Sequence, residues 1–234
     1  MDLDYSDCPI IKGSAIKALE DPEGPWGDGV LELIETVGEI TSLPDKAFDQ
    51  PFLMPIWRIY EKAGLGTVAV GRVERGVLRS GMDVELLGLK TDKLTVETGS
   101  MEIFGKTLEE AEGGDTIGVL LKGIPAHVVK RGMFLAKPGT ARVYSRMTAL
   151  ITMLTKDEGG RHKPFFDGYR AQILISTTEV TGTIRTSEFS IDPGSYADVT
   201  IELDRPAVIR AGMSFSIREN SRTIGFGRAT QIQN

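Results

Sequence analysis

The chain has 234 residues, of which 41% are hydrophobic and 27 are glycine, which excludes a disordered chain and fits two globular domains rich in turns. Residues 1–50 hold 12 acidic and 3 basic side chains and carry a net charge of −9, whereas residues 51–234 carry +3. Ordinary enzymes have a similar surplus of cations, so charge alone neither predicts nor excludes a nucleic-acid partner.

A single cysteine, Cys8, excludes an intramolecular disulfide and is expected of a reducing compartment. The first residues lack the basic and apolar segments of a secretory signal, and no apolar run is long enough to cross a bilayer. We therefore expect a soluble protein without a membrane partner.

The N-terminal 50 residues predict two helices. Ser14 is a good N-cap for a short helix over Ala15–Leu19, which the prolines and glycine of residues 21–25 end. A second, amphipathic helix is predicted over residues 28–42, ending before Pro44. Its apolar face consists of Val30, Leu33, Ile34, Val37 and Ile40, and its acidic face of Glu32, Glu35 and Glu39. This helix either docks on the later domains or has lost a sheet of its own.

Five short runs of alternating or β-branched residues follow, separated by glycine turns and without a long helix between them. They span residues 51–56, 66–73, 83–87, 94–98 and 115–121. Short strands in this arrangement predict an antiparallel barrel or sandwich. We place this domain at residues 52–138.

A second β domain is predicted over residues 142–234, near whose start lies an irregular loop. This loop contains two neighbouring aromatic residues, Phe165 and Phe166, each of which buries roughly 150–250 Å² when covered. Either they fold back on their own barrel or a partner covers them. Strands are predicted at residues 171–178, 197–203, 213–218 and 223–227, with turns at 192–194 and 219–221.

Several of these segments resemble elongation factor Tu, the translational GTPase of bacteria and organelles that carries aminoacyl-tRNA to the ribosome. The run KDEGGRHKPFFDGYR at residues 156–170 is similar to its third domain. Residues 9–20 resemble the last strand and the guanine-contacting loop of its GTPase domain. Similarity to its second domain is found at residues 66–68, 71–76 and 137–139.

The resemblance implies an all-β protein of two antiparallel β-barrels in tandem. Before them, residues 1–50 would be a short α-helical remnant of the family's α/β GTPase domain. The resemblance also implies a cytoplasmic protein or one of an organelle matrix, such as that of the mitochondrion.

The motifs that hold nucleotide phosphates are missing from this sequence. A phosphate-binding loop needs G-x-x-x-x-G-K-[ST], in which backbone amides and the lysine hold the phosphates and the hydroxyl binds magnesium. Gly66 and Gly71 have the glycine spacing, but Arg72 and Val73 follow, and no Asn-Lys-x-Asp guanine signature is present. We therefore expect no GTP hydrolysis and no other enzyme activity from this chain.

Two residues remain from the implied nucleotide site. By the resemblance, Ser14 and Ala15 are at the positions that touch the guanine base. We expect no cofactor for this chain by itself. GTP and magnesium would bind only if a longer or a second chain supplied a GTPase domain.

In the family, the second domain holds the 3′ end of charged tRNA. The resemblance implies an aromatic wall, an apolar floor and polar contacts, formed by Tyr60, Val68, Leu120, Glu102, Thr116 and Arg131. From residue type alone, the alternative for Val68 and Leu120 is barrel core, and the alternative for Glu102 and Arg131 is a solvated surface charge. Trp57 and Arg58 replace two carboxylates of the family pattern, and Arg58 reverses the charge at a site that faces an amino group.

In the third domain, the resemblance implies contacts with the T-stem of tRNA for Gln172, Thr181, Arg218 and Arg222. The alternative for the two arginines is a solvated hairpin tip. An interface with the GTPase domain is implied for Arg161, His162, Pro164, Phe165 and Phe166. His162 has no further ligand at metal-binding spacing, so we predict no metal site and no catalytic residue.

Three hypotheses follow from these observations. The chain is a truncated elongation factor Tu that binds tRNA, elongation factor Ts or the ribosome. Alternatively, it is an adaptor or structural protein that uses its barrels for protein contacts, which Trp57 and Arg58 favour. In a third hypothesis it is the C-terminal piece of a longer or split GTPase.

Overall fold

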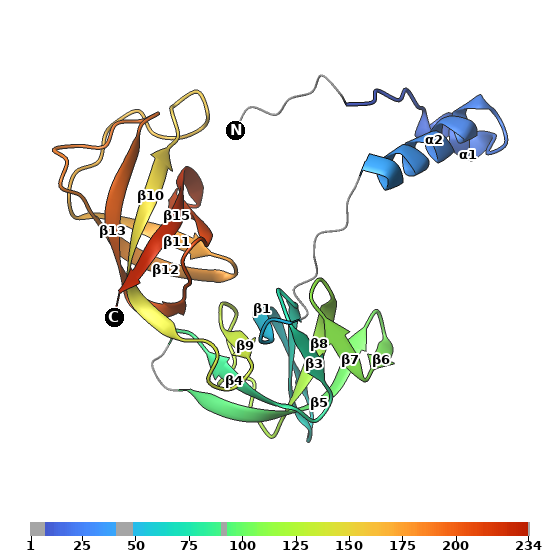
Figure 1. Ribbon diagram of the computed structural model, residues 1–234, viewed down its shortest axis with the longest axis horizontal. Helices are drawn as coiled ribbons and strands as arrows, with labels where there is room; N and C mark the ends of the chain where they lie inside the picture. The colour runs from blue at the N-terminus through green and yellow to red at the C-terminus, as the bar shows by residue number, and fades with distance from the viewer. Residues whose placement is uncertain (1–7, 41–48, 90–92, 234) are drawn as a thin grey trace. The chain divides into compact units, whose positions relative to one another are not determined.

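The computed structural model describes residues 8–40, 49–89 and 93–233 (Figure 1). These residues form two compact units, 1–46 and 47–234. The predicted class is confirmed, because the second unit is built of antiparallel strands in two closed barrels and helices occur only in the first. Among the described residues, no helix has both the length and the apolar character needed to span a bilayer.

The first unit consists of two helices, α1 (Ala15–Glu20) and α2 (Pro25–Ile40), which lie side by side (Figure 1). The Ser14 hydroxyl accepts a hydrogen bond from the Lys17 backbone amide at 3.5 Å, which confirms the predicted cap. The second helix begins at Pro25, earlier than predicted, because proline is well suited to the first helical position. Its end was predicted beyond Ile40, at residues outside the described part.

The strand that the family resemblance implied within residues 9–20 is not found there. Residues 8–14 adopt neither helix nor strand. A strand needs a neighbouring strand to satisfy its backbone amides and carbonyls, and no described residue of this unit forms one. The predicted apolar face of α2 is exposed within the unit, with 63% of both Ile34 and Ile40 accessible.

The first barrel is a ring of six strands in the order β4-β9-β1-β2-β8-β5, closed by pairing between β4 and β5. Strand β6 adds to β5, and β3 and β7 form a separate ribbon. The interior holds Met54, Ile56, Val119 and Leu121, all fully buried. The strands are β1 (Leu53–Lys62), β2 (Gly66–Arg72), β3 (Val77–Arg79), β4 (Asp83–Leu87), β5 (Leu94–Ile103), β6 (Lys106–Leu108), β7 (Glu110–Glu112), β8 (Thr116–Lys122) and β9 (Phe134–Ala136).

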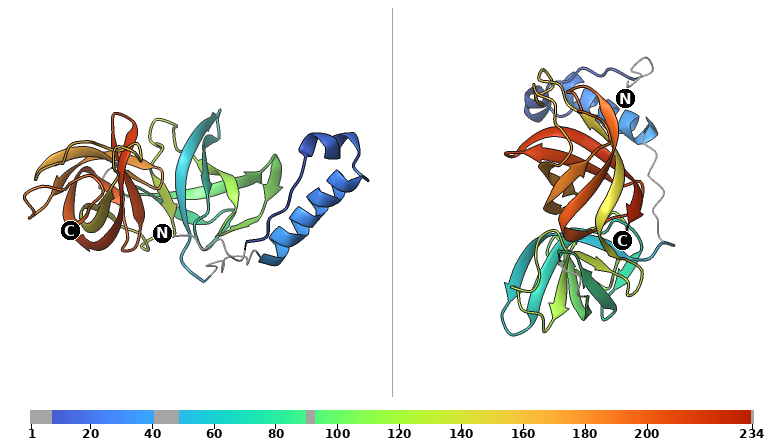
Figure 2. Two further views of the ribbon diagram at one scale, coloured as in Figure 1. Left: turned by 90° about the horizontal axis from the view of Figure 1, so that it is seen from above. Right: turned by 90° about the vertical axis from the view of Figure 1, so that its left-hand side faces the viewer.

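The second barrel closes through six strands in the order β10-β13-β12-β11-β14-β15, coloured yellow to red in Figures 1 and 2. They are β10 (Val143–Met153), β11 (Tyr169–Ile175), β12 (Thr178–Arg185), β13 (Tyr196–Val208), β14 (Ser214–Glu219) and β15 (Arg222–Gln233). The strand predicted at residues 171–178 is confirmed as far as Ile175 in β11, but its end is wrong, because Ser176, with φ of 52°, and Thr177 form a turn before β12.

Short contacts join the two barrels within the second unit. The buried Thr178 hydroxyl donates a hydrogen bond to the Gly132 carbonyl at 2.6 Å. Glu74 accepts from Arg210 at 3.3 Å. An apolar cluster also joins residues of both barrels, among them Leu53, Phe134 and Val208. The barrels therefore share a packed interface.

Candidate functional site

The outward side chains of β1, β2, β8 and β5 form one surface, which we name the first-barrel face. Tyr60 pairs with Val68, and Val68 with Leu120. A second row runs from Arg58 through Val70 and Gly118 to Glu102. Directly paired residues lie on the same side of a sheet, as do residues two apart along a strand. Five of the six predicted 3′-end residues, Tyr60, Val68, Glu102, Thr116 and Leu120, therefore share this face.

Val68 and Leu120 lie outside the barrel interior, so the core reading does not apply to them. Their neighbours Ala69, Val119 and Leu121 fill the interior cluster. Leu120 is buried because it packs on Gly99, where an added Cβ would lie 2.8 Å from the Leu120 Cδ2 atom. The two side chains thus form an apolar floor on the outside of the sheet.

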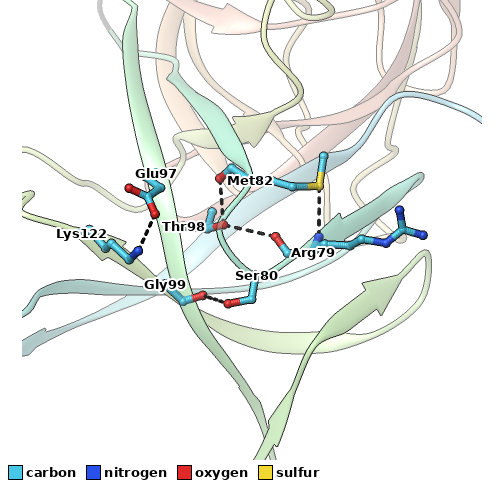
Figure 3. A network of polar contacts seen from close by, with 7 residues as sticks. All are labelled: Arg79, Ser80, Met82, Glu97, Thr98, Gly99 and Lys122. Carbon is cyan, nitrogen blue, oxygen red and sulfur yellow. Dashed lines mark hydrogen bonds and ion pairs between the residues drawn. The ribbon is translucent and has the colours of Figure 1, made fainter.

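Polar contacts fix the strand segment beneath this floor (Figure 3). The Thr98 hydroxyl donates to the Met82 carbonyl at 2.8 Å, and the Ser80 hydroxyl donates to the Gly99 carbonyl at 2.8 Å. These bonds join the loop before β4 to β5, where the pairing register with β8 shifts between Thr98 and Met101. The irregular part of β5 is therefore held by defined bonds.

A β-bulge in β1 places an aromatic and a cationic side chain next to each other. Ile56 pairs with Gly71 and Arg58 with Val70, so Trp57 is the extra residue. The Arg58 guanidinium lies 5.4 Å from the centre of the Tyr60 ring. Trp57 is 39% exposed and Tyr60 49% exposed, so both rings offer surface to a ligand. Sequence reasoning noted the altered residues and missed this stacking.

Most other charges of the first-barrel face are paired. Lys62 Nζ lies 3.7 Å from Glu102 Oε1, and Lys122 pairs with Glu97 (Figure 3). Arg72 Nε donates to the Gly114 carbonyl at 3.0 Å. In the described part of the chain, Arg58 has neither a hydrogen bond nor an ion pair. The face therefore carries an uncompensated positive charge above an aromatic ring.

Arg131, the sixth predicted 3′-end residue, lies in the exposed turn before β9. The next amide, of Gly132, donates to the Ile56 carbonyl at 3.0 Å, which brings this turn beside the bulge of β1. Another turn, between β5 and β6, exposes 96% of Phe104, which has a φ of 47°. No sequence signal singled out Phe104, because its unusual backbone is set by the hairpin.

Three of the predicted T-stem residues form one line on the second barrel, which we name the second-barrel row. Gln172 pairs with Thr181 on one side and with Arg218 on the other. Arg222 follows the turn of Asn220 and Ser221 and pairs with Glu219. Arg218 and Arg222 therefore belong to one hairpin, as the sequence predicted, and Arg218 lies in the row.

The five predicted interface residues divide between the interior and the surface. Phe165 is 2% exposed and stacks on Tyr169 with ring centres 4.9 Å apart, whereas Phe166 is 52% exposed and meets the Phe189 ring edge-on. Of these two phenylalanines, only Phe165 folds back on its own barrel. His162 is exposed, Pro164 and Arg161 are half-buried.

Arg161 belongs to a polar network between the loop before β11 and the end of β14. Its guanidinium donates to Glu219 Oε1 at 2.6 Å, and the Tyr169 hydroxyl donates to the same oxygen at 2.6 Å. Burial and this hydrogen bond to a carboxylate raise the pKa of Tyr169 to about 12. The network fixes the loop against the closing hairpin and borders a cavity of about 490 Å³ lined by residues 161 and 163–169.

The residues present do not fit the nucleotide that the family resemblance implies. The Ser14 hydroxyl caps α1, and Ala15 is exposed. Gly66 and Gly71 lie in β2, between two paired strands, and not in a strand-to-helix loop whose amides are free to hold phosphates. Among the described residues, no three His, Cys, Asp or Glu side chains lie close enough to hold a metal ion.

Family profiles match most of the chain beyond β1. Residues 66–136 match the profile of elongation factor Tu domain 2. Residues 140–233 match the profile of the elongation factor Tu C-terminal domain. Trp57, Arg58 and Tyr60 lie before the first matched segment, whereas the second-barrel row lies inside the second.

Proposed function

The chain belongs to the elongation factor Tu family, and from this premise we propose that it is an elongation-factor-like protein of translation that binds tRNA through its two barrels. The observation that supports tRNA binding is that predicted contact residues far apart in the sequence lie together on one surface of each barrel. Residues scattered from Tyr60 to Leu120 share the first-barrel face, and residues from Gln172 to Arg218 share the second-barrel row. Polar and cationic side chains in rows suit a phosphate backbone, and an aromatic face suits a nucleotide.

We further propose that this chain does not hydrolyse GTP. Its sequence supplies no phosphate-binding lysine, and its Gly66–Gly71 spacing belongs to a paired strand. Release of phosphate from GTP by the purified chain, above a protein-free background, would disprove this part of the proposal.

The proposed partners beyond tRNA are elongation factor Ts, the ribosome and, for a split protein, a separate GTPase domain. A second candidate function is an adaptor that binds proteins through exposed aromatic residues. The exposed pair of Phe166 and Phe189 favours it, since aromatic side chains are enriched at protein interfaces. In the adaptor hypothesis, Arg218, the cationic residue of the second-barrel row, has no role in binding.

A titration of fluorescent aminoacyl-tRNA over a salt series tests these candidates. The chain is measured alone and with a separately supplied GTPase domain of the family. Binding by the chain alone, with an affinity that falls as salt increases, supports the proposed function. Binding only with the added domain supports the split-GTPase hypothesis, and no binding in either condition supports the adaptor.

A further inference from the structure

The first-barrel face leaves one cation available to a ligand. Arg58 is exposed, and neither a carboxylate nor a hydrogen-bond acceptor of the described residues meets its guanidinium. A guanidinium has five donors, so an approaching anion finds a full set of hydrogen-bond partners. The Tyr60 ring, whose centre lies 5.4 Å from the guanidinium carbon, accepts no conventional hydrogen bond from these donors.

The surroundings of Arg58 suit an aromatic ligand that carries this anion. Trp57 and Tyr60, one and two residues from Arg58 in β1, are both partly exposed. Gly118, which pairs with Val70, has no side chain, and an added Cβ there would lie 3.2 Å from Val68 Cγ1, so no side chain from Gly118 covers the surface beside Val68. Nucleotide bases stack on aromatic rings of this kind whatever their identity.

The same cation disfavours a positively charged ligand. Glu102, the carboxylate in the same row as Arg58, already pairs with Lys62 at 3.7 Å. An ammonium group brought to Arg58 would therefore meet like charge without compensation, whereas a phosphate would meet an unpaired donor.

We infer that the first-barrel face binds a nucleotide through base stacking on Trp57 and Tyr60 and an anionic group at Arg58, and that it discriminates against a terminal ammonium. Resting on the proposed function, this makes Arg58 a specificity-determining residue for the tRNA 3′ end. The face prefers an end that bears a phosphate or a free hydroxyl over an end that bears an amino acid with a free α-ammonium.

The test compares three tRNAs of identical sequence whose 3′ ends carry a phosphate, a free hydroxyl or an amide-linked amino acid with a free α-ammonium. The 3′-phosphate form should bind about tenfold more tightly than the ammonium form. Arg58 attracts the phosphate and repels the ammonium, and solvent partly screens both interactions. Arg58→Glu should reverse the order, and Arg58→Gln should equalise the two. Arg79→Gln, an exposed arginine of the same barrel paired with Glu110, should leave the order unchanged.

A second measurement keeps the inference separable from tRNA binding. In a Trp26→Phe background, Trp57 is the only tryptophan, and its fluorescence reports adenosine 3′-monophosphate added to the whole chain. A fluorescence change that saturates with added nucleotide and is lost in Arg58→Glu supports nucleotide binding by the first-barrel face. If tRNA itself does not bind, that result counts against the proposed function and not against this inference. Equal or tighter binding of the ammonium-bearing tRNA, or no response of Trp57 to the mononucleotide, overturns the inference.

Discussion

The first-barrel face and the second-barrel row are both outer surfaces of antiparallel barrels, but they leave different side chains free. The face combines an apolar floor, two partly exposed rings and the unpaired Arg58. The row is a line of polar and cationic side chains, Gln172, Thr181 and Arg218, without an aromatic member. The first surface can therefore distinguish chemical groups, whereas the second suits a repeated charge such as a phosphate backbone.

The two surfaces also differ in whether their residues lie within the segments that match the family. The row lies within the segment that matches the family's C-terminal domain, at residues 140–233. Trp57 and Arg58 lie outside the segment that matches domain 2, which begins at residue 66. The row therefore lies in a matched segment, whereas the part of the face that carries Trp57 and Arg58 does not.

The largest effect should come from removing the support of the second-barrel row. Phe165→Ala takes away a ring that is 2% exposed and stacked on Tyr169. We expect the free energy of unfolding of the second barrel to fall by about 3–5 kcal/mol, the usual cost of truncating a buried phenylalanine. Denaturant unfolding followed by circular dichroism measures this loss.

Phe166→Ala is the matched control on the same loop. Its ring is 52% exposed, so stability should change by less than about 1 kcal/mol. Similar losses for the two variants would show that the loop is not held by Phe165 and would weaken the account of the row.

A second prediction concerns pH and the network that fixes this loop. The folded pKa of Tyr169, about 12, is higher than the unfolded value of about 10, so folding favours the protonated phenol. Its stabilisation is complete below pH 10 and is lost as pH rises from 10 to 12. Because the side chain is partly exposed, we expect this loss to be only about 1 kcal/mol.

Chemical denaturation at several pH values measures this effect as a difference between two proteins. Tyr169→Phe keeps the ring and the ion pair between Arg161 and Glu219 but removes the titrating group. The difference in stability between wild type and variant should shrink between pH 10 and 12. A constant difference over that range would mean that Tyr169 titrates as an ordinary exposed tyrosine.

The fold was largely predictable from the sequence because short alternating strands and glycine turns carry a local signal. The strand at residues 83–87 has the predicted bounds, and the family resemblance is confirmed for the two barrels. The turn at Ser176 and Thr177 was missed because the run on either side is continuously β-favouring, and only the closing of the barrel decides where it bends.

The candidate site was predictable as a set of positions but not as a set of contacts. Pairing register brings Tyr60, Val68 and Leu120 into one row, and a register is fixed by the whole sheet. The unpaired state of Arg58 likewise depends on which carboxylates the folded barrel brings near it. Glu102 pairs with Lys62 instead, although nothing in their sequence spacing indicates it.

A third prediction separates charge from selectivity on the two surfaces. Arg218→Gln and Arg222→Gln should each weaken binding of every tRNA end about threefold to tenfold. Each should also lower the slope of log affinity against log salt by about one, as expected for a lost phosphate contact. Arg58→Gln should instead remove the difference in affinity between the phosphate-bearing and ammonium-bearing ends. Arginine substitutions that change end selectivity from the second barrel would remove the distinction between the surfaces.

The smallest expected effect tests whether Arg58 itself, and not the total charge of its face, sets the selectivity. Glu97→Gln removes an exposed carboxylate that pairs with Lys122 and so makes the first-barrel face more positive without touching Arg58. Stability should change by less than about 1 kcal/mol, since exposed ion pairs contribute little. All three tRNA ends should bind about twofold more tightly, with their order unchanged, because a distant charge acts on the whole polyanion. Binding assays with the three ends at one salt concentration measure this effect. If Glu97→Gln widened the preference for the 3′-phosphate as much as Arg58→Gln narrowed it, selectivity would reflect the general field of the face, and the guanidinium above Tyr60 would have no special role.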